Sequence, residues 1–227
     1  MTPDNPAERI AGYRYPDPVN RHLEEVERIG ALLLAAGASS RMGSPKALLP
    51  WDGRPMIRHQ LAILGQVDFA SVVVVLGHDE PAISAAIRPD PDLRLAYNSL
   101  HASGRSSSIR LGAHLLGDLD AILLVNVDQP LSPLLLGDLL AGAADSPDPL
   151  ILIPTHEGQR GHPVLIRQPV FRELAGLDEH SLGLKTVIRG NRERVKHVET
   201  ADSYSVISFS THIEYERIKT GRFRQSG

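Results

Sequence analysis

The sequence contains no cysteine, and this absence excludes several kinds of chemistry at once. Without a thiol the chain forms no disulfide, uses no thiolate nucleophile and holds neither an iron–sulfur cluster nor a cysteinyl zinc site. A chain without disulfides suits a reducing compartment, and we therefore expect a cytoplasmic protein.

Long apolar runs and a strong net charge are also missing. No stretch has the length of a membrane span, and residues 1–30 do not read as a signal peptide. The net charge is −3, so no basic field indicates a nucleic-acid partner. We expect neither a membrane nor a nucleic acid as partner, and a bound anion must be held by a local site.

Apolar runs alternate with segments of helical period through the first 155 residues. Continuous or β-branched runs predict buried strands, and 3.6-residue periodicity predicts helices. This alternation predicts an α/β protein of three layers, α/β/α, with a mostly parallel twisted sheet. The expected strands are 29–37, 70–78, 93–99, 120–128, 149–155, 195–197 and 204–209. The expected helices are 56–67, 79–87, 106–117, 132–145, 169–176, 183–188 and 211–219.

The chain length suits one domain. At 227 residues it can bury one core. We expect an irregular N-terminal arm at 1–28 with a short helix near 21–28, a single domain at 29–220 and a tail at 221–227. In such sheets ligands bind beyond the carboxyl ends of the strands, so the segments after the strands are the candidate site.

The segment after the first strand, GASSRMGSPK, is flexible and cationic. Gly37 and Gly43 let the backbone approach an anion, while Arg41 and Lys46 supply a planar fork and a mobile charge. These residues suit a polyphosphate, although the pattern is neither a P-loop nor G-x-G-x-x-G. A surface turn with solvated cations is the alternative.

Asp128 ends a buried strand in the segment NVDQPLS. Ser132 followed by Pro133 already provides the cap of the next helix, so Asp128 is not needed for that purpose. A carboxylate that holds Mg²⁺ beside phosphates is the simplest interpretation.

Two further segments carry polar groups. Ser106, Ser107 and Ser108 open a helix after Gly104, where hydroxyls and backbone amides can read a nucleotide, or Ser106 can merely cap the helix. His162 lies in a Gly-rich turn. It is expected either to bind substrate or to have a structural role. Ser-His-Asp and His-x-x-x-His patterns are missing, so cations, one carboxylate and a helix N-terminus favour phosphoryl or nucleotidyl transfer.

The stretch LLAAGASSRMGSPKALLPWDGRPMI resembles the signature of the molybdenum-cofactor nucleotidyltransferase family. VVVVLGH, NSLHASGRSSSIRLG, LLVNVDQPL and GQRGHPVLI are similar to the later blocks of that family, in the same order. The resemblance implies a Rossmann-like nucleotidyltransferase fold that binds a nucleoside triphosphate and molybdopterin cofactor.

The resemblance also implies residue roles. Arg41 and Lys46 would hold phosphates, Asp128 would bind Mg²⁺, and His162 and Lys185 would contact the second substrate. The expected nucleotide-binding residues are Leu34, Ala35, Ala36, Gly37, Ser39, Gly77, Asn98, Ser106, Ser107 and Ser108.

The form LAAG, with Ala36 where guanylyltransferases tend to have glycine, is similar to the cytidylyltransferase branch, and so is the block SGRSSSIR. The implied reaction joins CTP and molybdopterin cofactor into the cytosine dinucleotide with release of pyrophosphate. A molybdenum hydroxylase apoenzyme is then a possible recipient of the product.

The C-terminal part departs from the family pattern. Ser208 and Ser210 stand where the family has carboxylates, Ser181 stands at another acidic position, and Lys185 replaces an arginine. Compensating carboxylates would have to come from Glu199, Asp202 or Glu214. Two other functions therefore stay open: an NAD(P)H-dependent oxidoreductase of the nicotine blue type, and a non-catalytic chaperone for the cofactor.

Overall fold

The fold is described from a computed structural model, which covers residues 27–87, 93–176 and 183–225. The predicted N-terminal arm and its helix lie almost wholly outside the described residues, as do Ser181 and the last two residues of the tail.

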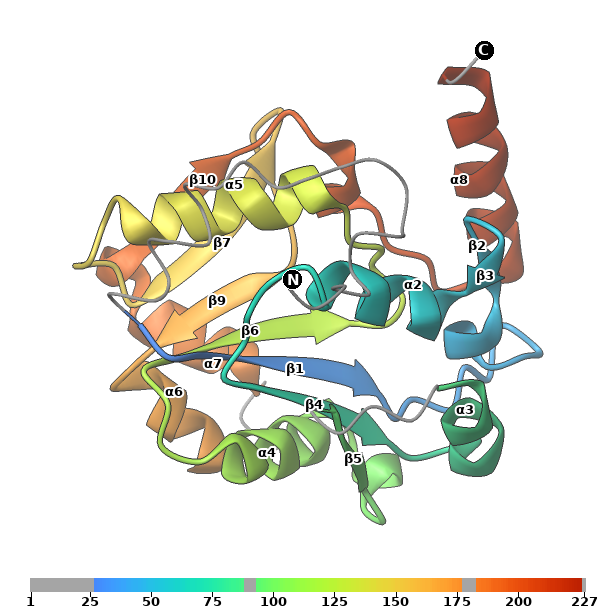
Figure 1. The fold of residues 1–227 in the computed structure, drawn as a ribbon, viewed down its shortest axis with the longest axis horizontal. Helices are drawn as coiled ribbons and strands as arrows, with labels where there is room; N and C mark the ends of the chain where they lie inside the picture. Colours follow the sequence, from blue (N-terminus) through green and yellow to red (C-terminus); the bar gives the residue numbers. More distant parts are fainter. Residues whose placement is uncertain (1–26, 88–92, 177–182, 226–227) are drawn as a thin grey trace, which may run out of the picture.

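A mostly parallel sheet forms the centre of the molecule (Figure 1). Its strands are β1 (Ile29–Ala35), β4 (Ser71–Leu76), β5 (Leu93–Tyr97), β6 (Ala121–Asn126), β7 (Ile151–His156), β8 (Gln159–Arg160), β9 (Val164–Arg167) and β10 (Val195–Glu199). Their order is β10-β7-β9-β6-β1-β4-β5, with β8 paired to β7. β9 runs antiparallel to β6 and β7, whereas the other neighbours along that path are parallel.

Helices cover both faces of this sheet. They are α2 (Met56–Leu64), α3 (Glu80–Ala86), α4 (Arg105–Leu116), α5 (Pro133–Ala144), α6 (Val170–Glu173), α7 (Leu184–Gly190) and α8 (His212–Gln225). α2 and α5 lie over one face, and α4, α6 and α7 lie over the other (Figure 1). The predicted three-layer α/β/α architecture is therefore confirmed. No helix in the described part of the chain combines the length and the apolar composition of a membrane span.

The continuous apolar run of β1 is explained by its position at the centre of the sheet. Leu33 and Ala35 pack into the core shared with α2 and α5, while Leu32 and Leu34 pack into the core on the α4 side. Because successive side chains of a strand point to opposite faces, both faces of β1 must be apolar.

The start of α5 is as predicted. Ser132 precedes the helix and its Oγ accepts a hydrogen bond from the Leu135 backbone N–H at 3.1 Å, while Pro133 is the first helical residue. The cap satisfies one of the unpaired N–H groups of the first turn.

The predicted strand at 204–209 is wrong, and the predicted helix at 106–117 begins one residue earlier. Residues 204–209 form no strand: Ser203–Val206 is a 3₁₀ turn (η7), because the Asp202 carboxylate accepts a hydrogen bond from the Tyr204 N–H at 2.8 Å and bends the chain. α4 begins at Arg105 with Gly104 as its N-cap, so Ser106 lies inside the helix and does not cap it. Gly104 has φ of +119°, which a side chain disfavours.

A small hairpin carries the aromatic core of the molecule. β2 (Pro50–Trp51) and β3 (Arg54–Pro55) are joined by Asp52 and Gly53, both with positive φ, as a two-residue hairpin turn requires. Trp51 stacks on Phe209 with ring centroids 6.3 Å apart, and Tyr215 packs edge-on against Phe209 at 5.4 Å. These contacts attach the C-terminal segment to the chain that follows β1.

Candidate active site

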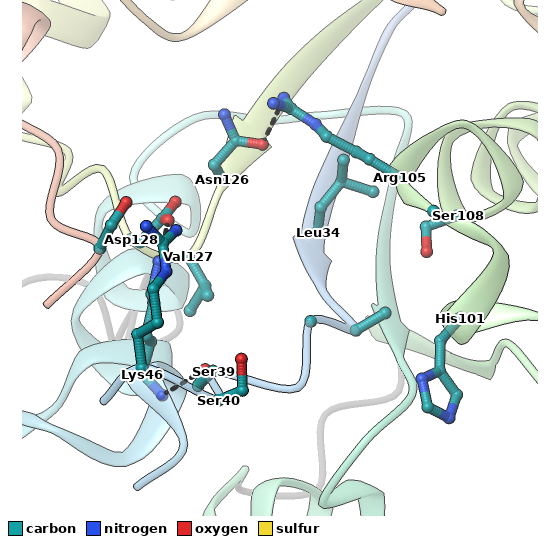
Figure 2. A pocket seen from close by; sticks show the side chains of 15 residues that line it. Leu34, Ser39, Ser40, Lys46, His101, Arg105, Ser108, Asn126, Val127 and Asp128 are labelled. Carbon is teal, nitrogen blue, oxygen red and sulfur yellow. Dashed lines mark hydrogen bonds and ion pairs between the residues drawn. The ribbon is translucent and has the colours of Figure 1, made fainter. Parts of the chain in front are cut away.

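A cavity of about 380 Å³ lies at the carboxyl ends of β1 and β6. Figure 2 shows its walls, which are the loop after β1, the end of β6 and the first turn of α4. The lining residues are Leu34, Ala36, Gly37, Ser39, Ser40, Arg41, Lys46, His101, Gly104, Arg105, Ser108, Asn126, Val127, Asp128 and Ser210.

The loop after β1 is folded around its own serine. Ser39 and Gly43 have positive φ, and the Ser39 Oγ accepts a hydrogen bond from the Lys46 backbone N–H at 3.2 Å. Met42, only 6% exposed, anchors the middle of the loop in the core. Arg41 is exposed beside this anchor and lines the cavity.

Lys46 and Asp128 meet in the cavity. The Lys46 Nζ donates to the Asp128 Oδ2 at 2.6 Å, and their side chains are 15% and 29% exposed. A partly shielded ion pair of this kind can exchange partners when a ligand brings its own anion.

Helix α2 holds the segment that presents Asp128. The buried Gln60 Nε2 donates to the backbone oxygens of Asn126 at 3.0 Å and Gln129 at 2.7 Å. Its Oε1 accepts from the Leu131 N–H at 2.9 Å. Three hydrogen bonds from one buried amide therefore fix the turn on both sides of Asp128.

The predicted site residues divide into two groups. Those that line the cavity are Leu34, Ala36, Gly37, Ser39, Arg41, Lys46, Ser108 and Asp128. Those that do not are Ala35, Gly77, Asn98, Ser106, Ser107, His162 and Lys185. Ala35 packs on the opposite face of the sheet because side chains alternate along β1, and Lys185 is exposed on α7.

The serines of α4 form a structural network more than a cavity wall. The Asn98 Nδ2 donates to the Oγ of Ser107 and of Ser108, each at 2.9 Å, and the Ser107 Oγ donates to the Gly104 oxygen at 2.7 Å. Ser106 is buried, and a Cβ on Gly183 would lie 2.4 Å from its Oγ. Among these polar residues, only Ser108 reaches the cavity lining.

Gly77 packs closely against two residues of the cavity wall, Ala36 and His101. A Cβ at this position would lie 2.7 Å from the Ala36 oxygen and 2.6 Å from the His101 Cβ. Glycine therefore allows the end of β4 to approach the segment that follows β1.

The sequence did not assign Ser40, His101, Arg105 or Asn126 to the site, and all four line the cavity. Ser210, which stands where the family has a carboxylate, lines it too. Arg105 is the most important addition, because its Nη2 donates to the Asn126 Oδ1 at 2.6 Å. Its position directly before the three serines that open the helix is the sequence signal for it. Burial lowers the pKa of Arg105, and the nearby Asp128 opposes this effect; an arginine still keeps its charge.

Glu199, Asp202 and Glu214, which could compensate for the missing family carboxylates, lie at different places in the structure. Glu199 and Asp202 do not line the cavity: Glu199 accepts from the Thr155 hydroxyl at 2.6 Å, and Asp202 caps η7. The exposed Glu214 accepts from the backbone N–H of Ser210 at 2.7 Å, and with the Thr211 N–H this lowers the pKa of its carboxyl group. Glu214 therefore caps α8 next to the cavity.

His162 lies in the turn between β8 and β9 and is not part of the cavity lining. Burial, and secondly the charge of Arg105, lower the pKa of His162 to about 4, while Asp128 opposes the shift. The imidazole is neutral near pH 7. Its Nδ1 is buried and has no hydrogen-bond partner among the described residues.

The cavity offers a metal ion only one carboxylate from its lining. Across the described residues, no group of three or more His, Asp or Glu side chains could hold a metal. Asp128 alone fits a cation that brings most of its oxygen ligands with it, as Mg²⁺ does when it is bound to phosphates.

Comparison with known proteins places the chain among nucleotidyltransferases. Residues 31–198 match the MobA-like NTP transferase domain. The chain is 40% identical to molybdenum cofactor guanylyltransferase of Xanthomonas euvesicatoria pv. vesicatoria over 111 residues, which are 48% of this chain and 52% of that protein. It thus spans about half the length of that relative.

Two other matches cover more of the chain. Nicotine blue oxidoreductase of Paenarthrobacter nicotinovorans is 31% identical over 180 residues, 77% of this chain and 88% of that protein. The crystal structure of the Mycobacterium tuberculosis Rv0371c homologue from Mycobacterium sp. strain JC1 superposes with a TM-score of 0.71 at 26% identity, over 87% of this chain and 98% of that one. The chain belongs to the MobA-like NTP transferase domain family.

Proposed function

We propose that this protein transfers a nucleoside monophosphate from a nucleoside triphosphate to the terminal phosphate of molybdopterin cofactor and releases pyrophosphate. The observation that carries the proposal is the convergence of Arg41, Lys46 and Asp128 on one cavity at the sheet edge. Two cations opposite one carboxylate match the charges of a triphosphate with its metal.

The lining residues then have distinct roles. Arg41 and Lys46 hold the triphosphate, and their charge stabilises the pyrophosphate that leaves. The backbone around Ala36 and Gly37, with Ser39 and Ser108, forms the floor for the nucleoside. An acceptor phosphate oxygen attacks the α-phosphorus, and the bond to the bridging oxygen of pyrophosphate breaks.

Mg²⁺ is the proposed metal, and Asp128 is the residue that would hold it. Bound with the triphosphate, the metal would neutralise charge on the phosphates. In the structure, the Lys46 ammonium group forms an ion pair with the Asp128 carboxylate. We infer that Lys46 moves to the phosphates when nucleotide enters, so that the carboxylate becomes available.

CTP is the proposed nucleotide because Ala36, which belongs to the cavity lining, stands where guanylyltransferases tend to have glycine. The similarity to a guanylyltransferase over half its length supports GTP instead. Direct comparison of the two nucleotides decides between them.

A second function has a specific observation in its favour. The match to nicotine blue oxidoreductase covers more of the chain than the match to the guanylyltransferase. A dinucleotide cofactor would also find cations in this cavity, without any need for a metal.

Thermal stabilisation separates these functions. We expect CTP with Mg²⁺ to raise the melting temperature, GTP to do so less, and NADPH to have no effect. Saturating ligand raises stability by about 2–4 kcal/mol. A metal-independent shift with NADPH would support the oxidoreductase. If CTP binds but no pyrophosphate is released when molybdopterin cofactor is present, the result supports the non-catalytic chaperone. Its recipient would be a molybdenum hydroxylase apoenzyme.

Lys46→Met provides the matching variant. The loss of its charge should abolish stabilisation by CTP, while Lys196→Met should not. Lys196 is also a bonded lysine, with its Nζ at 2.6 Å from the Ser146 Oγ, but it does not line the cavity. Equal CTP binding by the two variants would remove the phosphate role of Lys46.

A further inference from the structure

We propose that Arg105, held in place by Asn126, forms a second anion subsite that binds the phosphate group of the acceptor. The identification of the anion as the acceptor rests on the proposed function. The existence of the subsite rests on the geometry alone.

Arg105 and Lys46 belong to opposite walls of the cavity. In Figure 2, Lys46 and Asp128 lie on one side, and Arg105 extends from α4 above Leu34 toward Asn126. The loop after β1 and the first turn of α4 therefore each supply positive charge to the same space.

Arg105 forms no direct ion pair among the described residues, although the Asp128 charge is near enough to act on it. Within the residues that the structure describes, no carboxylate oxygen lies at ion-pair distance from its guanidinium, whereas Lys46 is 2.6 Å from Asp128. The guanidinium has five N–H donors, and one of them binds the neutral Asn126 oxygen. The remaining donors suit the paired oxygens of a phosphate.

Asn126 fixes the direction of that guanidinium. Its Oδ1 accepts from Arg105, and its Nδ2 donates to the Gln129 Oε1. The side chain is 6% exposed, and the backbone oxygen of the same residue is held by Gln60. A fixed acceptor of this kind reduces the freedom that Arg105 would lose when it binds a ligand.

The need for a separate subsite follows from the reaction. The acceptor phosphate must come within about 3.5 Å of the α-phosphorus of another polyanion. Arg41 and Lys46 lie where they would hold the leaving pyrophosphate, so a different cation has to offset the repulsion between the two substrates. The acceptor oxygen is already unprotonated, so it forms the new P–O bond without giving up a proton.

Arg105→Met tests the subsite with inorganic phosphate as the probe. Phosphate is titrated calorimetrically into protein with and without a saturating non-hydrolysable α,β-methylene analogue of CTP and Mg²⁺. With the analogue in place, the variant should bind phosphate about tenfold more weakly than the unmodified protein, the loss expected for a charge-assisted contact. Affinity for the analogue should change by less than about twofold.

Arg172→Met is the matched control, because Arg172 is 72% exposed and pairs with Asp118 away from the cavity. It should bind phosphate as the unmodified protein does. Equal loss of phosphate and analogue in Arg105→Met would assign Arg105 to the triphosphate and overturn the proposal, as would unchanged phosphate binding. If no nucleotide analogue binds but phosphate binding still depends on Arg105, the proposed function fails and the anion subsite stands.

Discussion

At the scale of single residues, the alternation of side chains along β1 decides which of them can touch a ligand. Ala35 and Ala36 are neighbours in sequence, yet only Ala36 lines the cavity, while Ala35 packs into the core under α2 and α5. Of these two alanines, only Ala36 is therefore placed to influence the choice of base.

Ala36→Gly should shift the preference from CTP toward GTP. Removal of the methyl group widens the floor, and a change of one small group in a pocket typically alters discrimination by about 10-fold or more. The ratio of the two dissociation constants is the measurement. Ala35→Gly is the control, since it creates a glycine at the neighbouring position, the last residue of β1, outside the cavity. An unchanged ratio in Ala36→Gly would contradict the role of Ala36 in base selection.

His162 makes stability depend on pH. Its folded pKa of about 4 lies below the ordinary value of 6.5, so the unfolded chain binds the proton more readily. Above about pH 6.5 the histidine is neutral in both the folded and the unfolded chain and does not change the free energy of unfolding. As the pH falls from 6.5 toward 4, only the unfolded chain takes up the proton, so the free energy of unfolding decreases by up to about 3 kcal/mol.

Urea unfolding of His162→Asn at several pH values checks this dependence. The variant should lose less stability than the unmodified protein between pH 7 and pH 4, because asparagine does not titrate. His114→Asn is a useful control. Parallel stability curves for His162→Asn and the unmodified protein would contradict the prediction.

At the scale of elements, the packing of α4 on β1 positions one wall of the cavity. A Cβ at Gly112 would lie 2.1 Å from the Leu32 Cδ1, so the helix can approach the strand only with glycine at this point. The same helix carries Arg105 and Ser108 in its first turn. A shift of its axis would displace both.

Gly112→Ala should destabilise the fold by about 1–3 kcal/mol, the usual effect of overpacking a core. Gly190→Ala, at the end of α7, meets no atom within 4 Å and should be neutral or slightly stabilising. Denaturant unfolding compares the two. A Gly112→Ala protein as stable as Gly190→Ala would show that α4 does not depend on this close approach.

At the scale of the whole molecule, a chain with few aromatic residues places several of them at one junction. Trp51, Phe209 and Tyr215 join the hairpin after β1 to the C-terminal segment, and Lys46 lies 5.9 Å from the Phe209 ring centroid. The next residue, Ser210, lines the cavity. The C-terminal segment thus completes a site that is otherwise built from residues before 130.

Trp51→Ala should lower stability by about 3–5 kcal/mol, because a fully buried ring is lost. It should also weaken nucleotide binding, since Trp51 stacks on Phe209 and the Lys46 Nζ lies over the Phe209 ring. Tyr97→Ala, which removes a ring that is 58% exposed, should change stability by less than about 0.5 kcal/mol. Thermal unfolding and CTP titration measure both effects, and undiminished CTP binding in folded Trp51→Ala would separate the cluster from the site.

The sequence by itself determined the order of strands and helices and the location of the cavity. Apolar runs mark buried strands locally, and parallel strands bring their carboxyl ends to one edge, so Arg41, Lys46 and Asp128 could be placed together without coordinates. The cap at Ser132 was equally local, because it depends on neighbouring residues alone.

Only the tertiary structure decided which side chains face that cavity. The antiparallel direction of β9, the turn at η7 and the pairing of Arg105 with Asn126 all depend on contacts between segments far apart in the chain. Asn98 turns Ser107 inward in the same way. The periodicity of apolar residues indicates which face of a helix or strand is buried. The orientation of a single side chain also depends on contacts with residues far away in the sequence, which a local pattern does not include.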